Sequence, residues 1–223
     1  QCREKCHSIR GGHYEVEFSN KGMDFKDTTT IRLVCDYKKQ PDDKVFGKLF
    51  AATTEGDGWR GTTIYTGKEY IICHNNEATI MSCDRWIDKI NAIRHNVRFY
   101  DVLTEPNASP MPNDKTLNDT LTTYSLTETT LDGKPCYKAD YVRTKFEPNM
   151  LGMQPLRLYV QIWIDKQTYM PLQLTSVIDL KEGEDTPCQY QQHKLLAFDS
   201  TIDESRFTLN AIPAGTTMKD YVP

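Results

Sequence analysis

Apolar and polar residues alternate along much of this chain of 223 residues, and this alternation limits the possible folds more than any other feature of the sequence. The clearest example is the stretch 156–165, in which every second residue is Leu, Val or Ile. Successive side chains of a β-strand point to opposite faces, so these apolar residues would share one face of a strand. On a helix they would scatter around the cylinder. The stretch therefore predicts a strand with one apolar face.

The same pattern predicts further strands on both sides of this one. They span residues 13–19, 29–37, 45–53, 62–65, 70–74, 78–81, 121–129, 136–146, 172–180 and 189–198. Most neighbours are joined by short links rich in Gly, Asn, Asp or Pro, and such links connect antiparallel strands. Roughly ten or eleven strands in one sheet rarely stay flat. We therefore expect a mainly β fold, in which a strongly curved antiparallel sheet forms an open half-barrel.

Helices are expected at only a few places. Residues 1–8 predict the end of one helix, and residues 84–96 predict another, with Asp84 as its cap and apolar residues three or four positions apart. Residues 203–207 predict a single turn, and the segment 105–118, with its three prolines, predicts a long irregular loop. We expect the helices to pack on the concave side of the sheet. Residues 1–223 are expected to form a single domain, because either half alone would leave an apolar sheet face uncovered.

The charge and the lengths of the apolar runs exclude two classes of partner. The chain has 27 Lys and Arg residues against 31 Asp and Glu residues, for a formal net charge of −4. A nucleic-acid-binding protein is expected to carry a basic surface, so no nucleic-acid partner is predicted. No run approaches the roughly 18 apolar residues that a membrane-spanning helix needs, so no transmembrane segment is predicted.

The motifs that usually signal catalysis are missing or ambiguous. Residues 56–61 match the G-x-G-x-x-G pattern, but the strand-like residues 62–65 follow them, where a nucleotide-binding loop would open a helix. A glycine-rich hairpin turn is therefore expected. The sequence has no H-E-x-x-H, G-x-S-x-G or C-x-x-C pattern. Pairs of carboxylates that could flank a sugar would arise in any chain with 31 acids. We predict no catalytic residue, no metal site and no cofactor, and hence a protein that is not an enzyme.

Five of the seven cysteines fall into two groups. Cys35, Cys73 and Cys136 lie within strand patterns and are expected to be buried as small apolar residues. Cys2 and Cys6 are four residues apart, on one face of the predicted N-terminal helix. They could pack as thiols or form a disulfide in an oxidising compartment, and the spacing leaves both possibilities open.

Several short segments resemble one known family. They are the strand 156–165 that ends in Asp165 and turns into residues 170–174, the hairpin 64–71, and the closing segments 203–209 and 212–215. Together they resemble the LolA/LolB-like outer-membrane lipoprotein carriers. The resemblance implies an eleven-stranded open half-barrel whose concave side holds helices and acyl chains, and a place in the periplasm or cell envelope. This chain is longer than a typical carrier, and no binding residue of the family can be matched to a position in it.

Both ends of the chain lead to further expectations. It begins at Gln1 without an apolar leader, so we expect an exported protein whose signal peptide has been removed, or a segment that starts internally. Residues 218–223 resemble the junction after which some envelope proteins continue into a thioredoxin-like domain. The chain is then expected to be the N-terminal module of a longer protein.

Two functions from different classes follow. The first is a non-enzymatic envelope module that binds an apolar ligand, such as a lipid or the acyl chains of a lipoprotein, because several strands carry apolar residues on both faces, where a water-facing side should be polar. Its predicted cavity residues are Phe46, Phe50, Leu158, Val160, Ile162, Leu172 and Leu174. The alternative is a protein-docking or sensing module attached to a thiol-disulfide oxidoreductase domain, which would bind another envelope protein through surface aromatics such as Trp59, Trp163 and Tyr159. Those aromatics could equally be cross-strand packing pairs.

Overall fold

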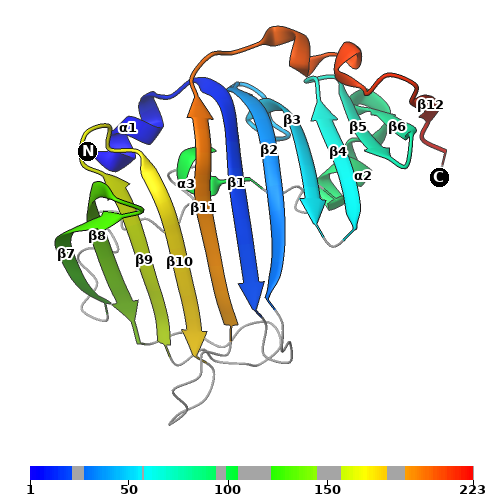
Figure 1. Ribbon diagram of the computed structural model, residues 1–223. Helices are drawn as coiled ribbons and strands as arrows, with labels where there is room; N and C mark the ends of the chain where they lie inside the picture. Colours follow the sequence, from blue (N-terminus) through cyan, green and yellow to red (C-terminus); the bar gives the residue numbers. More distant parts are fainter. Residues whose placement is uncertain are drawn as a thin grey trace. The chain divides into compact units, whose positions relative to one another are not determined.

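The computed structural model describes residues 1–21, 28–56, 58–93, 99–104, 122–144, 157–179 and 189–222. Within these ranges the fold is mainly β, with twelve strands and three short α-helices (Figure 1). The helices are α1 (Cys2–Ser8), α2 (Cys83–Ile93) and α3 (Asp101–Thr104), and two 3-10 turns, η2 (Glu204–Phe207) and η3 (Leu209–Ala211), lie near the C-terminus. The strands are β1 (Gly11–Lys21), β2 (Thr29–Lys39), β3 (Lys48–Gly56), β4 (Trp59–Tyr65), β5 (Glu69–His74), β6 (Glu77–Ser82), β7 (Thr122–Leu131), β8 (Lys134–Arg143), β9 (Arg157–Asp165), β10 (Pro171–Asp179), β11 (Gln189–Asp199) and β12 (Thr217–Asp220).

The strands form one sheet in the order β12-β6-β5-β4-β3-β2-β1-β11-β10-β9-β8-β7. The sheet is open, because β12 and β7 are its two edges. Neighbours from β2 to β6 and from β7 to β11 pair antiparallel, and β12 pairs parallel to β6. The predicted mainly β fold with an open, largely antiparallel sheet is confirmed.

The chain divides into two compact units. Unit 1 comprises residues 1–8, 17–30 and 100–195, and unit 2 comprises residues 9–16, 31–99 and 196–223. The strands β1, β2 and β11 each contribute residues to both units. The assignment of residues 1–223 to a single domain stays a prediction.

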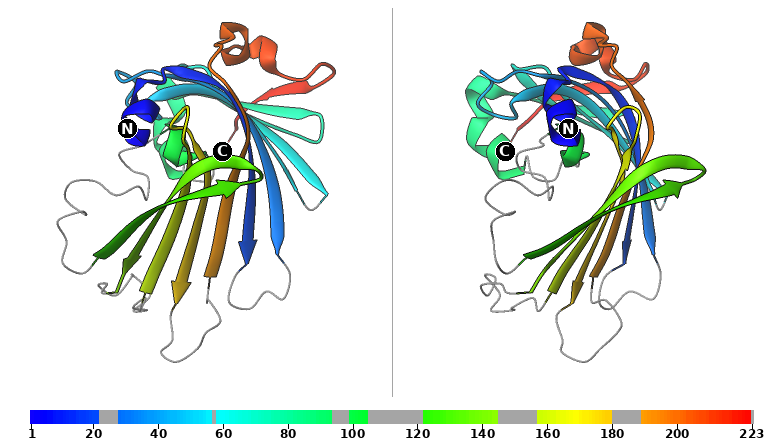
Figure 2. Two further views of the ribbon diagram at one scale, coloured as in Figure 1. Left: turned by 60° about the vertical axis from the view of Figure 1, so that its left-hand side comes forward. Right: turned by 90° about the vertical axis from the view of Figure 1, so that its left-hand side faces the viewer.

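In unit 1, the helices α1 and α3 contact each other, and Figure 2 shows both on one side of β9 and β10. Tyr100, just before α3, is fully buried, and its hydroxyl donates to the carbonyl oxygen of Pro171 at 3.2 Å. The first residue of β10 is thereby tied to α3. The sequence did not predict α3, because four residues are too few to show a helical period.

In unit 2, α2 packs against β5 and β6, and Ile90 is its buried apolar residue. The helix begins at Cys83, one residue before the predicted start, and residues 94–96 of the predicted helix lie outside the described residues. On β3 to β6, Ala51, Ile64, Ile71, Cys73 and Ala78 form a buried cluster, against which Ile80, Ala211 and Ile212 pack. The C-terminal segment therefore covers an apolar part of the sheet.

One strand prediction needs correction, and one strand was not predicted. The strand predicted at 45–53 begins only at Lys48, because the Asp43 carboxylate accepts hydrogen bonds from the backbone N–H groups of residues 45, 46 and 47 and holds them in a turn. The strand β12 was missed, because all four of its residues are exposed and show no apolar alternation. The single turn predicted at 203–207 is confirmed as η2, with Asp203 as its cap.

Candidate apolar ligand-binding face

The strand register of unit 1 brings four of the predicted cavity residues to one face. Leu158, Val160 and Ile162 alternate along β9, and Leu174 of β10 lies directly opposite Ile162. Alternation puts Leu172 in the same row of β10, but the register shifts between Pro171 and Gln173, so it is not aligned with a residue of β9.

The neighbouring strands extend this face with residues that the sequence analysis did not select. Tyr141 of β8 lies opposite Val160, and Tyr124 of β7 lies opposite Tyr141, with 6.1 Å between the two ring centroids. On the other side, Ile178 of β10 lies opposite Leu158. The alternation of Tyr137, Ala139 and Tyr141 within the strand predicted at 136–146 was the signal that could have added residues of β8 to this face. We define the apolar face as Tyr124, Ala139, Tyr141, Leu158, Val160, Ile162, Leu174 and Ile178.

Burial changes along this face. Val160, Ile162 and Leu174 are 0%, 1% and 2% exposed. Leu158, Tyr141 and Ile178 are only half-buried, and they lie together where β8 and β10 end and β9 begins. Burial raises the pKa of Tyr141 above its usual value, so this phenol stays neutral and acts as a largely apolar ring. The half-buried end still has apolar area to bury.

The buried end of the face is covered from within unit 1. The ring of Tyr100 lies 6.5 Å from that of His193, and His193 lies opposite Leu174 in the register. Phe18 of β1 packs edge-on against the same imidazole at 4.6 Å. Burial raises the pKa of Tyr100 well above its usual value. This end of the face is a packed core, and any ligand must be sought at the other end.

A positive charge lies beside the half-buried end. Arg143, the last residue of β8, is exposed and lies opposite Leu158. A guanidinium at the edge of an apolar surface suits a molecule with a hydrocarbon body and an acidic head.

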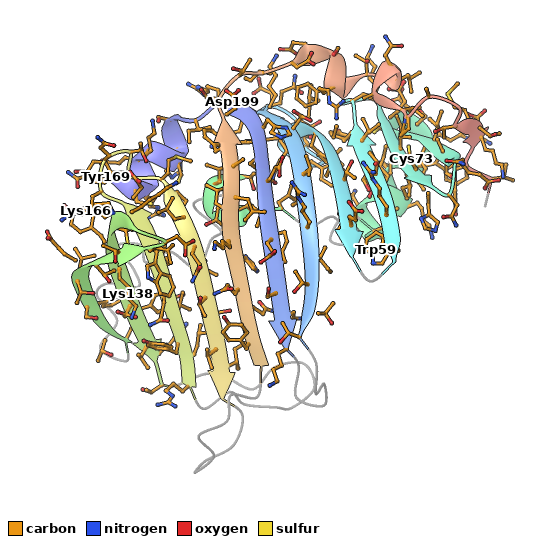
Figure 3. All side chains as sticks on the ribbon, in the orientation of Figure 1. Trp59, Cys73, Lys138, Lys166, Tyr169 and Asp199 are labelled. Carbon is orange, nitrogen blue, oxygen red and sulfur yellow. The ribbon has the colours of Figure 1, made fainter. Side chains whose placement is uncertain are left out.

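The opposite face of the same strands is polar. The Asp140 carboxylate accepts hydrogen bonds from the Tyr159 hydroxyl at 3.0 Å and from Gln161 Nε2 at 2.7 Å, and Lys138 Nζ lies 3.3 Å away. Burial would raise the pKa of Asp140, but these donors outweigh it and hold the pKa below its usual value. Lys138 Nζ also lies over the ring of Trp163, at 5.5 Å from its centroid. Figure 3 labels Lys138. Tyr159 and Trp163, two of the surface aromatics named for docking, are thus engaged in cross-strand contacts.

Phe46 and Phe50, the other two predicted cavity residues, lie in unit 2. Phe50 is fully buried, and its ring centroid lies 5.0 Å from that of Phe46 and 4.9 Å from that of Phe99. Phe46 also packs against Tyr65 at 4.7 Å and against Tyr70 at 5.7 Å. The rings pack against one another as a core does. The seven predicted residues therefore belong to two separate clusters.

Six of the seven cysteines lie within the described ranges. Cys35, Cys73 and Cys136 are buried, as predicted. Burial raises the pKa of Cys35 to about 12, so this thiol is unreactive. Among the described residues, no group of three or more His, Cys, Asp or Glu side chains could hold a metal ion. None of the described helices is long and apolar enough to cross a membrane.

Comparison with known proteins gives structural neighbours only. No family model matches the sequence, and no curated protein matches it. A domain from Vibrio parahaemolyticus named for outer membrane lipoprotein sorting is 9% identical, with 95% of this chain and 94% of that chain covered and a TM-score of 0.34. A LolA superfamily protein from Nitrosomonas europaea is 10% identical, with coverages of 94% and 97% and a TM-score of 0.33. MucB is 11% identical over 96% of this chain but only 61% of its own, with a TM-score of 0.43. The family that the sequence resembles is thus represented among the neighbours.

Proposed function

We propose that this protein binds the hydrocarbon chain of a lipid or an acylated protein on the apolar face of unit 1, without catalysing a reaction. The observation that carries the proposal is the cluster of half-buried Tyr141, Leu158 and Ile178 at one end of a sheet face whose other end is fully buried. A hydrocarbon chain laid on these residues would remove further apolar surface from water, at about 25 cal/mol for each Å² buried. The sequence resemblance supports the same ligand class and a place in the cell envelope.

Binding of a fluorescent fatty acid tests the proposal. Dansyl-undecanoic acid should bind the full chain saturably, with a blue-shifted emission, because the dansyl group leaves water. Leu158→Asn should weaken binding about tenfold, since it puts an amide on the apolar face. Native mass spectrometry of gently purified protein should show a bound lipid.

A matched variant on the opposite face separates binding from folding. Val142→Asn changes a half-buried residue of β8 that lies on the polar face, beside Arg143. It should leave the affinity within about twofold of that of the unmodified chain. Saturable binding that L158N and V142N weaken equally, or no binding by the folded chain, would contradict the proposal.

A further inference from the structure

A polar cavity of about 850 Å³ lies wholly within unit 2. Its lining comes from strands β3 to β6 and from the C-terminal segment that includes η2 and η3. Thr53, Thr62 and Cys73 lie opposite one another on three adjacent strands and line part of it, with 2.9 Å between the two threonine hydroxyl oxygens. The volume is in the range of pockets that take small organic molecules. Nothing in the proposed binding of a hydrocarbon chain uses this cavity.

The cavity carries an excess of positive charge. Arg60 and Arg206 both line it, together with a single acid, Glu77, whose carboxylate is already paired with Lys219 Nζ at 2.6 Å. Arg206 uses Nε to bind Asp36 Oδ2 at 3.1 Å, which fixes the side chain. Among the residues that the structure describes, no hydrogen bond or ion pair engages the terminal nitrogens of Arg206.

Arg60 is the second arginine of the cavity whose guanidinium has N–H donors that no described contact uses. Its register partner on β3 is Glu55, yet among the described contacts no ion pair joins the two side chains. Arg60 is exposed, and its backbone carbonyl oxygen lies 3.2 Å from Nδ1 of His74. A carbonyl can only accept, so Nδ1 is the protonated nitrogen of that imidazole. Two guanidinium groups, each with N–H donors that no described contact uses, thus line one cavity. Guanidinium groups bind carboxylates and phosphates through paired N–H groups.

The indole of Trp59 lies on the other face of the same strands. Trp59 is 43% exposed at the start of β4, where Figure 3 labels it. A Cβ added at Gly61 would lie 3.2 Å from Cζ3 of this indole, so the ring rests on the face to which Gly61 belongs. Gly61 and Thr62 are neighbours in β4, and successive residues of a strand face opposite sides, so this is not the face of Thr53, Thr62 and Cys73. The charged contacts in the cavity therefore come from the two arginines.

We propose that this cavity binds a small organic anion, whose carboxylate or phosphate group is held by Arg60 and Arg206. This site is independent of the apolar face, because every residue that lines it belongs to unit 2. Loss of fatty acid binding would therefore leave this proposal intact.

Titration of the full ¹⁵N-labelled chain, followed by NMR, tests the site. The probes are phenyl phosphate and benzoate, with benzyl alcohol as the neutral counterpart and inorganic phosphate as the head group alone. At least one of the two ring-bearing anions should shift the backbone amide signals of Arg60, His74 and Arg206 saturably, and benzyl alcohol should not. The anion that binds more tightly, phenyl phosphate or benzoate, shows whether the cavity prefers a phosphate or a carboxylate group. No saturable shift with either anion, or an equal response to benzyl alcohol, would overturn the proposal.

Matched variants show how much each arginine contributes to anion binding. Arg60→Gln and Arg206→Gln should each weaken anion binding about tenfold, whereas Arg10→Gln, which removes an exposed guanidinium outside the cavity, should change nothing. Asp36→Asn removes the ion pair of Arg206 but leaves the positive charge of Arg206 in the cavity. The anion affinity should therefore stay within about twofold of that of the unmodified chain. An R60Q chain that binds as well as the unmodified one, or equal losses in D36N and R206Q, would overturn the assignment.

Discussion

At the scale of single residues, a few carboxylates determine where strands begin and end. Asp43 is the clearest case. Its Oδ1 accepts from the backbone N–H groups of Val45, Phe46 and Gly47 at 3.1, 2.8 and 3.0 Å, and its Oδ2 accepts from the Tyr65 hydroxyl at 2.7 Å. Burial raises the pKa of Tyr65, and the hydrogen bond to Asp43 raises it further, so this hydroxyl remains a donor. One side chain thus positions the turn that carries Phe46 into the aromatic cluster.

Removing this carboxylate should destabilise unit 2. Asp43→Ala leaves three backbone donors and one phenol without their acceptor, and we expect the free energy of unfolding to fall by about 3 kcal/mol. Urea unfolding, followed by circular dichroism, measures the loss. Asp42→Ala is the control, because Asp42 is exposed in the same turn. Equal losses in D43A and D42A would show that the turn, rather than these hydrogen bonds, carries the effect.

Asp165 should make stability depend on pH. Its Oδ1 accepts from Gln167 N, Thr168 N and Thr168 Oγ1 at 2.9, 2.7 and 2.9 Å. Burial would raise the pKa of Asp165, but these donors outweigh it and hold the pKa below the usual value of 3.8. A carboxyl whose pKa is lower in the folded than in the unfolded chain stabilises the fold above its unfolded pKa, and the stabilisation is lost as the pH falls through the folded pKa.

Urea unfolding of Asp165→Asn across the acid range measures this contribution. The variant should be about 1 kcal/mol less stable than the unmodified chain near neutral pH. The difference should shrink once the pH falls below about 4. Asp42→Asn serves as the control and should show no such dependence. A difference for D165N that stays constant down to about pH 2 would contradict the electrostatic origin.

At the scale of elements, the start of β1 approaches its neighbours so closely that only glycine fits. A Cβ at Gly11 would lie 2.4 Å from the carbonyl oxygen of Tyr37, and one at Gly12 would lie 2.2 Å from that of Asp199. Gly12 also has φ +149°, which other residues rarely adopt. The sequence shows two adjacent glycines before a strand, but the close approach arises from β2 and β11, which are distant in the sequence.

Gly12→Ala should therefore disrupt this part of unit 2. Its methyl group would collide with backbone atoms that cannot rotate away, and we expect a loss of about 3 kcal/mol in the free energy of unfolding. Gly133→Ala is the matched control, because Gly133 has φ +78° with no atom within 4 Å of an added Cβ, and only its backbone strain of about 1 kcal/mol should appear. Thermal unfolding compares the two variants. The steric argument fails if G12A is no less stable than G133A.

At the scale of the whole molecule, the two units are connected by three strands that contribute residues to both. Such strands cannot unfold in one unit without losing the residues that continue into the other. We therefore expect the chain to unfold in one cooperative transition, as a single domain does.

Two single-tryptophan variants test this expectation. One keeps only Trp163, in β9 of unit 1, and the other keeps only Trp86, in α2 of unit 2. The urea midpoints from their fluorescence should coincide with each other and with that from circular dichroism. Circular dichroism of each variant checks that removing the other two tryptophans has not changed the stability of the chain. A fluorescence midpoint that differs from the circular dichroism midpoint of the same variant would show that the units unfold independently.

The strands could be predicted because alternation is a local property. Burial of Cys35, Cys73 and Cys136 followed from it, as did the shared face of Leu158, Val160, Ile162 and Leu174. The short elements α3 and β12 could not be predicted, since neither is long enough to show a period. The candidate site was only partly predicted. The sequence showed which residues are apolar, but it could not separate Phe46 and Phe50 from the other five, and the prediction did not include Tyr124, Tyr141 and Ile178.

The sequence by itself determined the mainly β class, the antiparallel pairing of successive strands and the parity of each apolar row, because a strand alternates whatever it pairs with. Only the tertiary structure decided which rows become a filled core and which stay half-buried, since burial depends on the elements that pack against them. The same holds for the anion site, where Arg60 and Arg206 lie 146 positions apart in the chain and share one cavity only because the C-terminal segment packs on the sheet.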